Sequence, residues 1–586
     1  MSLSTYSSSS YAVETVFAVP ELFLLIQSFL DRADNVALLS LSRQAFARAA
    51  PVVWESVELK QLLQLITGVQ MAPPRSVLSS VHSIVQQYCT VTFPKSVELT
   101  RFRLYSSFVK VLRADGLYSI DYSDNLPTPL LPNLQRLVLH VHGSAEAKYI
   151  DWVSRLLTPS LKELKLLSVD QQHTSEPHGF LDLAWLDLDT YLSLVDKVSA
   201  SCPQIQALRI FGAGQGQKGL GWTDLWRNWI TARHSQQMID SVNSMSNHFH
   251  AFYPNYISFD KLAGLHHLRS LSITIPYIGQ AMLQNLGQLP RLDNLSLHIN
   301  IPMLQPLDHT PITLPANSFP SLRHLALYRP HPSVFELFLQ PCSLFRNLLT
   351  ARIHIESSQG DDRVTLRRLP SNAVVQCFSQ SSSALTNLTI SSDAERNCFT
   401  LFWPTINIFS HMPLKRLDLG SIQFNPVPIA FAVEANGMQA NLPHIQWKDF
   451  LAAVPLLEAL VLSRQNVAVQ DLQTILHMLP KLRSLVLCSI QLDEVFGAQS
   501  LPDERIVGEP ITICAGFKAL FKTDDAYIDQ LAKHLHTLRT GIAFEAGKVQ
   551  MPCGQHWVNP SFVEKLNSVV KFLTSEGGTD RACNIK

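Results

Sequence analysis

A glycine-rich stretch, GQGQKG at 214–219, is the first segment of the sequence whose residue types could do chemistry. It matches the G-x-G-x-x-G pattern whose backbone N–H groups cradle a dinucleotide, and it lies between an apparent strand and a helical segment. The acidic residue that should end a second strand about 20 positions later is missing, because Asp240 lies in a helical pattern. Gln217 replaces a glycine of the Walker pattern, and no Ser or Thr follows Lys218. We therefore interpret the stretch as a loop and expect no nucleotide cofactor.

Metal-binding and nucleophilic patterns are also missing from the sequence. His248 and His250 form a His-x-His pair, but no third ligand stands at a suitable spacing. Neither an HExxH nor a GxSxG segment occurs. We expect no metal, no cofactor and no catalytic residues, so the protein is predicted not to be an enzyme. The alternative, an enzyme with a dinucleotide-binding insertion, depends on GQGQKG alone.

Composition disfavours several kinds of partner. The chain holds 47 Lys and Arg against 47 Asp and Glu, so no net field attracts nucleic acid or a membrane surface. No run of about 18 apolar residues and no signal peptide is visible, and we expect no membrane span. The nine cysteines lack a paired spacing, which is typical of thiols in a reducing compartment. We therefore expect a cytoplasmic or nuclear protein.

A short leucine phrase recurs along most of the chain and must position any functional residue. It has the form L-x-x-L-x-L, and its last two leucines, two positions apart, point to the same face of a short strand. Neither can be buried within one copy, so neighbouring copies have to stack. A weaker copy, TARIHI, lies at 350–355. The ten clear copies begin at Leu134, Leu161, Ile205, Leu268, Leu292, Leu322, Leu385, Leu414, Leu457 and Leu482.

A proline two residues before the first leucine marks the start of most copies. Because proline cannot continue a helix and favours an extended preceding residue, it predicts a change from helix to strand. Segments between copies, such as 471–481, have apolar residues at helical spacing. The prolines are Pro132, Pro159, Pro203, Pro290, Pro320, Pro455 and Pro480.

The phrases, their prolines and the helical segments resemble the leucine-rich repeat family over roughly residues 130–490. The resemblance implies an α/β solenoid in the form of a horseshoe. The family usually places an Asn or Cys three residues after the last leucine, where it ties the turns together. Here only Asn300 fits that position. We therefore expect an irregular horseshoe whose unit lengths vary and whose turns are held mainly by packing.

Residues that alternate with the leucines are predicted to line the concave side of the sheet. Their chemistry is mixed, so they do not indicate a single type of ligand. A curved sheet of variable side chains suits the binding of another protein, although part of the set can be plain solvated strand residues. The predicted target-binding residues are Arg136, His140, Lys165, Arg209, His298, His324, Tyr328 and Arg416.

Three short helices are predicted ahead of the repeats. The second is expected to be capped by Asp34, and the third to run from Arg43 to Ala50 and to end at Pro51. Phe23 and Leu24 add apolar surface beside the main face of the first helix, so this helix must be buried on more than one side. The main face consists of Leu22, Leu25, Ile26, Phe29 and Leu30.

The segment from Pro20 to Trp54 resembles an F-box of the type common in fungal proteins, which ends in a tryptophan and a short VEL strand. Val19, Asn35, Ser42 and Phe46 depart from the usual residues without adding a charge to the buried face. The resemblance implies that the first helix docks the small adaptor of a cullin–RING ubiquitin ligase. The alternative is a helical cap that shields the first strand of the solenoid. The matching positions are Pro20, Glu21, Leu22, Ile26, Leu30, Asp34, Leu39, Ser42, Phe46 and Trp54, and the implied adaptor contacts are Pro20, Leu22, Ile26, Leu30 and Leu39.

These patterns predict a substrate-recognition subunit of an SCF-type ubiquitin ligase, with the adaptor, a cullin and a target protein as partners. The alternative is a leucine-rich-repeat scaffold without a ligase role. An insertion at 212–260 carries three tryptophans at helical spacing, which is typical of a core stripe and also suits partner binding. The predicted parts are a disordered N-terminus (1–16), the F-box (17–60), a connecting or capping region (61–129), the solenoid (130–545), and a C-terminal cap and tail (546–586).

Overall fold

The computed structural model divides the chain into two compact units, unit 1 (Met1–Thr274) and unit 2 (Ile275–Lys586). The predicted disordered N-terminus, GQGQKG, the His248 and His250 pair and the tryptophans of the insertion lie outside the residues that the structure describes. The described residues are 19–72, 75–78, 85–94, 98–114, 117–121, 126, 128–141, 147–168, 188–210, 260–275, 278–299, 312–328, 343–355, 371–392, 399–402, 408–420, 422–425, 447–492, 509–519, 525–539, 542–546 and 563–571.

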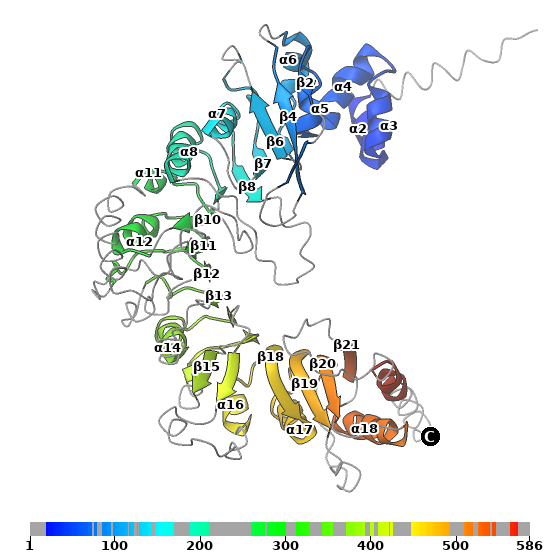
Figure 1. Ribbon diagram of the computed structural model, residues 1–586, viewed down its shortest axis with the longest axis vertical. Helices are drawn as coiled ribbons and strands as arrows, with labels where there is room; N and C mark the ends of the chain where they lie inside the picture. The colour runs from blue at the N-terminus through cyan, green and yellow to red at the C-terminus, as the bar shows by residue number, and fades with distance from the viewer. Residues whose placement is uncertain are drawn as a thin grey trace, which may run out of the picture. The chain divides into compact units, whose positions relative to one another are not determined.

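Unit 1 begins with three short helices, α2 (Pro20–Phe29), α3 (Arg32–Leu38) and α4 (Arg43–Val53) (Figure 1). Pro20 occupies the first turn of α2, where its missing N–H is no loss. The side chains of Asp31 and Ser42 accept backbone N–H groups at the starts of α3 and α4. Local capping therefore explains where all three helices begin.

Two predicted helix ends differ from the structure. Asp34 does not cap α3 but lies in its first turn, because Asp31 already has the extended backbone of a cap and accepts the N–H of Asp34 at 2.8 Å. The third helix does not end at Pro51 but continues to Val53. A proline in the last turn removes one helical N–H without shortening the helix, and Trp54 N–H still bonds to the Ala50 carbonyl at 3.0 Å.

A parallel sheet forms the rest of unit 1, with the strand order β1-β5-β7-β8-β9-β10. The first two strands of this sheet, β1 and β5, lie before the first leucine phrase, which begins at Leu134. A second, smaller sheet joins β2 (Gln70–Met71), β3 (Arg75–Leu78), β4 (Val85–Thr92) and β6 (Leu117–Asp121). The strands of the main sheet are β1 (Ser56–Glu58), β5 (Val111–Ala114), β7 (Arg136–Val141), β8 (Glu163–Ser168), β9 (Ala207–Ile210) and β10 (Ser270–Ile275). The helices are α5 (Leu59–Leu63), α6 (Thr100–Ser106), α7 (Ala147–Ser154), α8 (Leu188–Ser201) and α11 (Asp260–Ala263).

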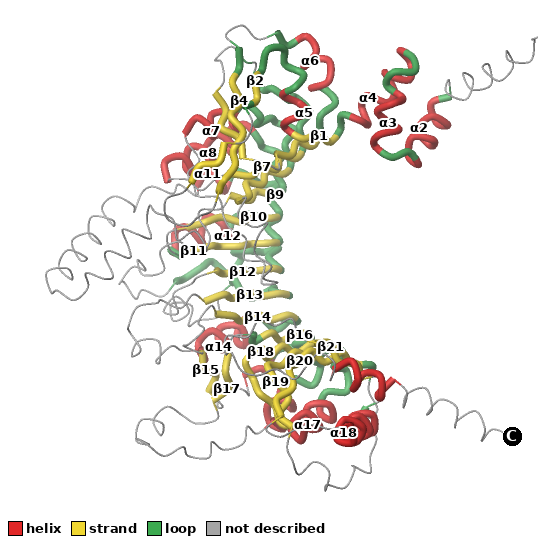
Figure 2. The backbone as a smooth tube through the Cα atoms, turned by 45° about the vertical axis from the view of Figure 1, so that its right-hand side comes forward, coloured by secondary structure: helices red, strands yellow, loops and turns green. Residues whose placement is uncertain are grey.

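Unit 2 repeats the same architecture, with the strand order β11-β12-β13-β14-β16-β18-β19-β20-β21 and neighbours that run parallel (Figure 2). A separate pair joins β15 (Phe399–Phe402) to β17 (Ile422–Asn425). The main strands are β11 (Asn294–Ile299), β12 (His324–Tyr328), β13 (Thr350–Ile355), β14 (Asn387–Ser392), β16 (Arg416–Asp418), β18 (Ala459–Ala468), β19 (Ser484–Leu492), β20 (Ile511–Ala519) and β21 (Ile542–Ala546). The helices are α12 (Gln280–Gly287), α14 (Ser371–Ser381), α16 (Trp447–Ala453), α17 (Val469–Met478) and α18 (Asp525–Leu538).

Every predicted leucine phrase, the weak copy included, is a strand with its preceding turn. In each of the ten clear copies all three leucine-type side chains are buried, and none is more than 4% exposed. The seven prolines all lie in the turn before the strand, as predicted. Since each buried side chain contributes roughly 1.5–3 kcal/mol only when a neighbouring copy covers it, the copies stabilise one another. The fold is the predicted irregular leucine-rich-repeat solenoid.

A backbone ladder at the start of each strand joins successive copies. The carbonyl of one residue before each strand accepts two consecutive N–H groups from the next copy, at 2.7–3.1 Å. The prediction that the turns are held mainly by packing concerns the turns after the strands, so this ladder does not test it. The acceptors are Glu55, Lys110, Gln135, Lys162 and Gln206 in unit 1, and Asp293, Arg323, Leu349, Thr386, Lys415 and Glu458 in unit 2.

Polar side chains tie the proline turns together in place of the usual asparagine. Ser160 Oγ donates to the carbonyl of Pro132 at 3.0 Å, and Ser321 Oγ donates to that of Pro290 at 2.7 Å. Each side chain lies one copy after the proline whose carbonyl it binds. The predicted exception, Asn300, lies outside the described residues.

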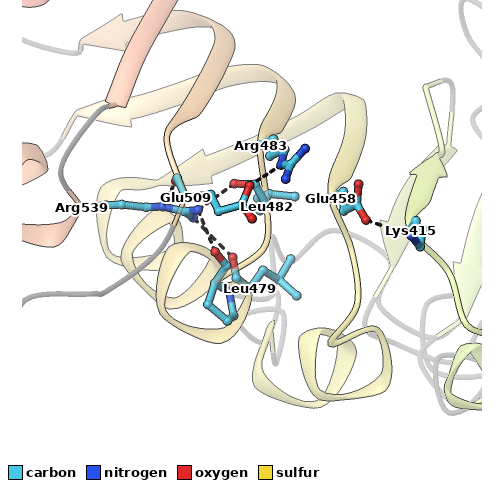
Figure 3. A network of polar contacts seen from close by, with 8 residues as sticks. Lys415, Glu458, Leu479, Leu482, Arg483, Glu509 and Arg539 are labelled. Atoms are coloured by element: carbon cyan, nitrogen blue, oxygen red, sulfur yellow. Dashed lines mark hydrogen bonds and ion pairs between the residues drawn. The ribbon is translucent and has the colours of Figure 1, made fainter.

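Arg539 makes the most extensive tie of this kind, at the turn between α18 and β21 (Figure 3). Its side chain is fully buried, and burial lowers the pKa of its guanidinium while the nearby Glu509 carboxylate opposes that effect. Its guanidinium donates to the carbonyls of Glu509 (2.7 Å), Leu479 (3.4 Å), Pro480 (2.9 Å) and Leu482 (2.8 Å). One side chain therefore holds the turns before β19 and β20 together.

Replacing Arg539 by Leu is expected to destabilise the C-terminal end of unit 2 by about 3 kcal/mol, because four backbone carbonyls lose the guanidinium and those of Leu482 and Glu509 have no other hydrogen bond in the described part of the chain. Arg539→Lys should recover only part of this, since one ammonium group cannot span four acceptors on two turns. Urea unfolding, with hydrogen exchange of the amides in β20 and β21, measures the effect.

Arg483→Gln is the matched control, because Arg483 forms an exposed ion pair with Glu509 in the same network. We expect no measurable shift of the urea midpoint for this variant. Equal hydrogen-exchange protection in Arg539→Leu and in the wild type would contradict the role given to Arg539.

Candidate functional site

The three N-terminal helices share a very small core. It consists of Phe23, Leu38, Ala45 and Ala49, and Leu30 and Leu39 pack against it while partly exposed. The Arg48 guanidinium lies over the Phe23 ring, 5.9 Å from its centre. Such a core can cover only one side of α2.

The other side of α2 is an exposed apolar surface. Leu22, Leu25 and Phe29 are 42%, 55% and 82% exposed, at the i, i+3 and i+7 positions that share one helical face. The sequence predicted that α2 is buried on more than one side, by the repeats or by a partner, and within the described residues only the Phe23 side is covered. Apolar residues of α2 extend beyond one stripe, so α3 and α4 decide which stripe is covered. Exposed Leu24, Val36 and Leu41 enlarge the apolar surface, and we name the six residues together the helical apolar surface.

Asn35 fixes the angle between α2 and α3. Its side chain is buried, and its amide donates to the carbonyls of Leu30 at 3.1 Å and Asp31 at 2.9 Å, with a longer contact to Gln27 at 3.4 Å. The carbonyls of Asp31 and Gln27 also accept backbone N–H groups, from Asn35 at 3.1 Å and from Leu30 at 3.2 Å, so the Asn35 amide is a second donor to them. The unusual Asn35 of the F-box-like pattern therefore has a structural role, because an apolar residue could not donate to the backbone between α2 and α3.

Aromatic contacts attach α4 to the repeats of unit 1. The ring of Trp54 lies 4.4 Å from that of Tyr105 in α6, and the ring of Phe46 lies 6.0 Å from it. Arg32 of α3 donates to the Gln61 side chain at 2.9 Å. Figure 2 shows α4 nearer to β1 than α2 is. Leu22, Leu25 and Phe29 therefore belong to the helix that lies farther from the sheet.

The predicted adaptor contacts fall into two groups. Pro20 and Leu22 are exposed, Ile26 is half-buried, and Leu30 and Leu39 are half-buried against the small core. Their role in binding stays a prediction. The sequence-based set leaves out Leu25 and Phe29, the two most exposed residues of the same face, although the helical spacing already placed them beside Leu22.

The open face of the unit 1 sheet carries a cluster of charges. Arg136 and Lys165 both form ion pairs with Glu163, whose side chain is only 13% exposed. Arg113 and Arg209 occupy the register column of Lys165 on β5 and β9. The structure therefore brings together three predicted residues, Arg136, Lys165 and Arg209. The side chain of the fourth, His140 in β7, lies outside what the structure describes.

Glu163 is the centre of this cluster. Burial by itself would raise the pKa of its carboxyl, but hydrogen bonds and charges from Lys165 and then Arg136 outweigh burial, and the pKa of Glu163 lies below its ordinary value. The carboxylate therefore stays ionised at neutral pH and holds both cations on the open face.

In unit 2 the structure brings His298 and Tyr328 together. Their rings stack with centres 4.2 Å apart and an angle of 12° between the planes. His354 lies next along the column, its ring centre 6.5 Å from that of Tyr328, and its Nδ1 shares a 2.9 Å hydrogen bond with Ser391 Oγ. Sequence analysis missed His354 because it is in the weak copy, where it nevertheless occupies the position equivalent to Tyr328.

The remaining predicted residues of unit 2 are not part of this stack. His324 is half-buried and lies in the column of Asn294 and Thr350, at the opposite end of the strands. Arg416 Nη2 lies 3.8 Å from the Asp418 carboxylate on the same strand. The polar face of unit 2 is therefore divided among small groups rather than gathered into one site.

Groups for chemistry are sparse in the part of the chain that the structure describes. Within it no three His, Cys, Asp or Glu side chains are placed to hold a metal ion, and no helix has the length and apolar character needed to cross a membrane. Burial raises the pKa of the Cys202 thiol to about 12, so this group stays protonated. The described surfaces are suited to binding.

Comparisons with known proteins give a likeness in solved structures. No protein-family model matches the chain, and no curated protein matches it. The chain is similar to the leucine-rich repeat-containing protein LegL7 from Legionella pneumophila, with 11% identity over 77% of this chain and 92% of that one and a TM-score of 0.25. It is also similar to a chain of the Rad7 and Elc1 complex in yeast (11% identity, 71% and 85% covered, TM-score 0.25) and to a TDR receptor (13%, 81% and 82%, TM-score 0.20). TM-scores this low do not establish a shared fold. The assignment of the repeat fold is therefore based on the buried leucines and the strand register.

Glu163→Gln is expected to lower the stability of unit 1 by about 1 kcal/mol at neutral pH, because the ion pairs with Lys165 and Arg136 are lost. A carboxyl whose pKa is lower in the folded state stabilises above its unfolded pKa of about 4.3 and loses that effect as the pH falls through the folded pKa. The difference between wild type and variant should therefore be present at about pH 7 and shrink as the pH falls below about 4.3 toward the lower folded pKa of Glu163.

Urea unfolding at several pH values checks this, with Glu564→Gln, an exposed carboxylate of the helix at 563–571, as the surface control. A difference that persists unchanged at acid pH would show that Glu163 acts through packing and not through charge.

Proposed function

We propose that this protein is the substrate-recognition subunit of a cullin–RING ubiquitin ligase of the SCF type. The three N-terminal helices form the F-box and dock the ligase adaptor, and the sheet face of the repeats holds a target protein. The partners are the adaptor, through it a cullin, and the target. The cytoplasm or the nucleus is the compartment in which these partners would be met.

The helical apolar surface is the observation that carries this proposal. A chain with 46% apolar residues and tightly filled repeats has no need to leave a phenylalanine 82% exposed beside exposed leucines. The F-box-like pattern assigns adaptor docking to the same helix, α2, although of the implied contacts only Leu22 belongs to this surface. An apolar helix face laid against a partner is a common mode of recognition, and it supplies the burial that α2 lacks within this chain.

The alternative of a helical cap receives less support. A cap that shields the first strand would turn the apolar side of α2 toward the repeats. In the described part of the chain the buried side chain of α2, Phe23, packs with Leu38, Ala45 and Ala49 of the neighbouring helices. A scaffold without a ligase role would still need some partner to cover Leu25 and Phe29.

The proposed protein does no chemistry of its own and is not an enzyme. It raises the local concentration of the target beside the ubiquitin-loaded partner and orients the target lysines. Two separate binding steps follow, one on the helices and one on the sheet face, so variants can remove each without the other.

The Leu25→Glu/Phe29→Glu double variant is expected to abolish adaptor binding. Both side chains are exposed, so the fold is kept while two charges enter an apolar contact, and the affinity should fall by roughly 100-fold or more. Titration calorimetry of the full chain with the purified adaptor measures the loss.

Leu104→Glu is the matched control, because Leu104 of α6 is 51% exposed in the same unit but lies outside the helical apolar surface. It should bind the adaptor as the wild type does. Failure of the folded wild type to bind the adaptor, or equal binding by the double variant, would remove the ligase role and leave the scaffold.

A further inference from the structure

The charges on the open face of the unit 1 sheet are not evenly mixed. The alternating positions of β1, β5, β7, β8, β9 and β10 that face away from the buried leucines hold four side chains of Arg or Lys and two of Glu. The cations are Arg113, Arg136, Lys165 and Arg209, and the anions are Glu58 and Glu163. We name the four cations the basic row.

The basic row is local, although the chain as a whole has equal numbers of basic and acidic residues. In unit 2 the equivalent positions of β11 to β14 hold mostly Asn, Ser, Thr and Ala, with Arg352 as the cation at the central position. An acidic partner would therefore bind the sheet face of unit 1 in preference to that of β11 to β14.

Arg113, Lys165 and Arg209 of the basic row share one register column, and Arg136 lies two residues away in the column of Glu163. Each cation lies on a different strand, and neighbouring strands are about 4.8 Å apart, so β5 to β9 spans about 14 Å. An extended peptide rises about 3.3 Å per residue, so four or five residues laid across the strands would span the row. Nε and Nη2 of Arg209 are buried, so such a peptide would meet mainly Arg113, Arg136 and Lys165. The geometry fits several separate carboxylates better than one compact anion.

Glu163 holds two members of the row in position. It binds Arg136 from its own column and Lys165 two residues along the strand, and both keep exposed surface beyond the pair. A guanidinium has five N–H donors and an ammonium has three, so each can bind a further carboxylate while it stays on Glu163. Because Glu163 already orders Arg136 and Lys165, these two side chains lose less conformational entropy when a partner binds.

We infer that the unit 1 sheet face binds an extended acidic segment, rich in Asp and Glu, of a partner protein. Charge complementarity with the basic row supplies the specificity, and the flanking Val111 and Val138 give the segment apolar contact. The inference rests on the proposed function only in identifying this partner as the ligase target.

Nucleic acid fits the same face less well. Single-stranded binding needs aromatic rings on which bases stack, and the described open positions of these six strands hold no Phe, Tyr or Trp.

The test uses the full-length protein and a fluorescein-labelled peptide of about twelve residues in which Glu alternates with Ser. We expect anisotropy to show binding that weakens as salt rises and is absent for the peptide with Gln in place of Glu. Arg113→Gln/Lys165→Gln should weaken binding roughly tenfold, whereas Arg101→Gln, an exposed arginine of α6 in the same unit, should not.

Circular dichroism melting checks that the double variant is folded. If the double variant is not folded, the single variant Arg113→Gln is used in its place. Equal binding of the Gln peptide, or no effect of the variants, would overturn the inference. The inference would also be overturned if a Ser–Gln peptide with one phosphoserine, or an oligonucleotide of similar length, bound more tightly than the Glu peptide. Either result would mean that the face prefers a different anion. Titration of the same proteins with the adaptor separates the two proposals. If the wild type binds the acidic peptide but not the adaptor, the ligase role alone is removed.

Discussion

A single backbone carbonyl at the start of each strand, which accepts two N–H groups from the next copy, is the interaction on which the other surfaces depend. It sets the register of neighbouring strands to within one residue, and a slip of one residue would exchange the buried and open sides of a strand. With the register held, leucines stack on leucines. The positions between them then form columns such as Arg113, Val138, Lys165 and Arg209.

The ladder uses only main-chain groups, so it leaves the side chains at its positions unrestrained. These positions hold residues as different as Glu55, Lys110, Leu349 and Thr386. The second set of ties, onto the proline carbonyls, uses hydroxyl groups in some copies and a guanidinium in another. Several turns thus have a donor of their own kind, and these ties do not depend on a repeating asparagine.

The leucine spacing and the prolines were sufficient to predict the repeat strands, because burial at period two is a property of the residues themselves. The strand β5 was missed since its buried positions are Val109, Leu112 and Ala114, and alanine carries little hydrophobic signal. The helical spacing placed Leu22, Leu25 and Phe29 on one face of α2, but it could not show that α3 and α4 cover Phe23 instead of that face. The columns on the sheet, and with them the meeting of His298, Tyr328 and His354, require the register between strands that lie far apart in sequence.

The buried guanidinium of Arg539 has a consequence for the order in which the chain becomes stable during synthesis. Its acceptors at Leu479, Pro480 and Leu482 leave the ribosome 57 to 60 residues before it does. Until then the turns before β19 and β20 are joined by other ties, among them the bond from the Glu509 N–H to the Pro480 carbonyl. The last repeats therefore gain their full set of ties only after translation has passed residue 539.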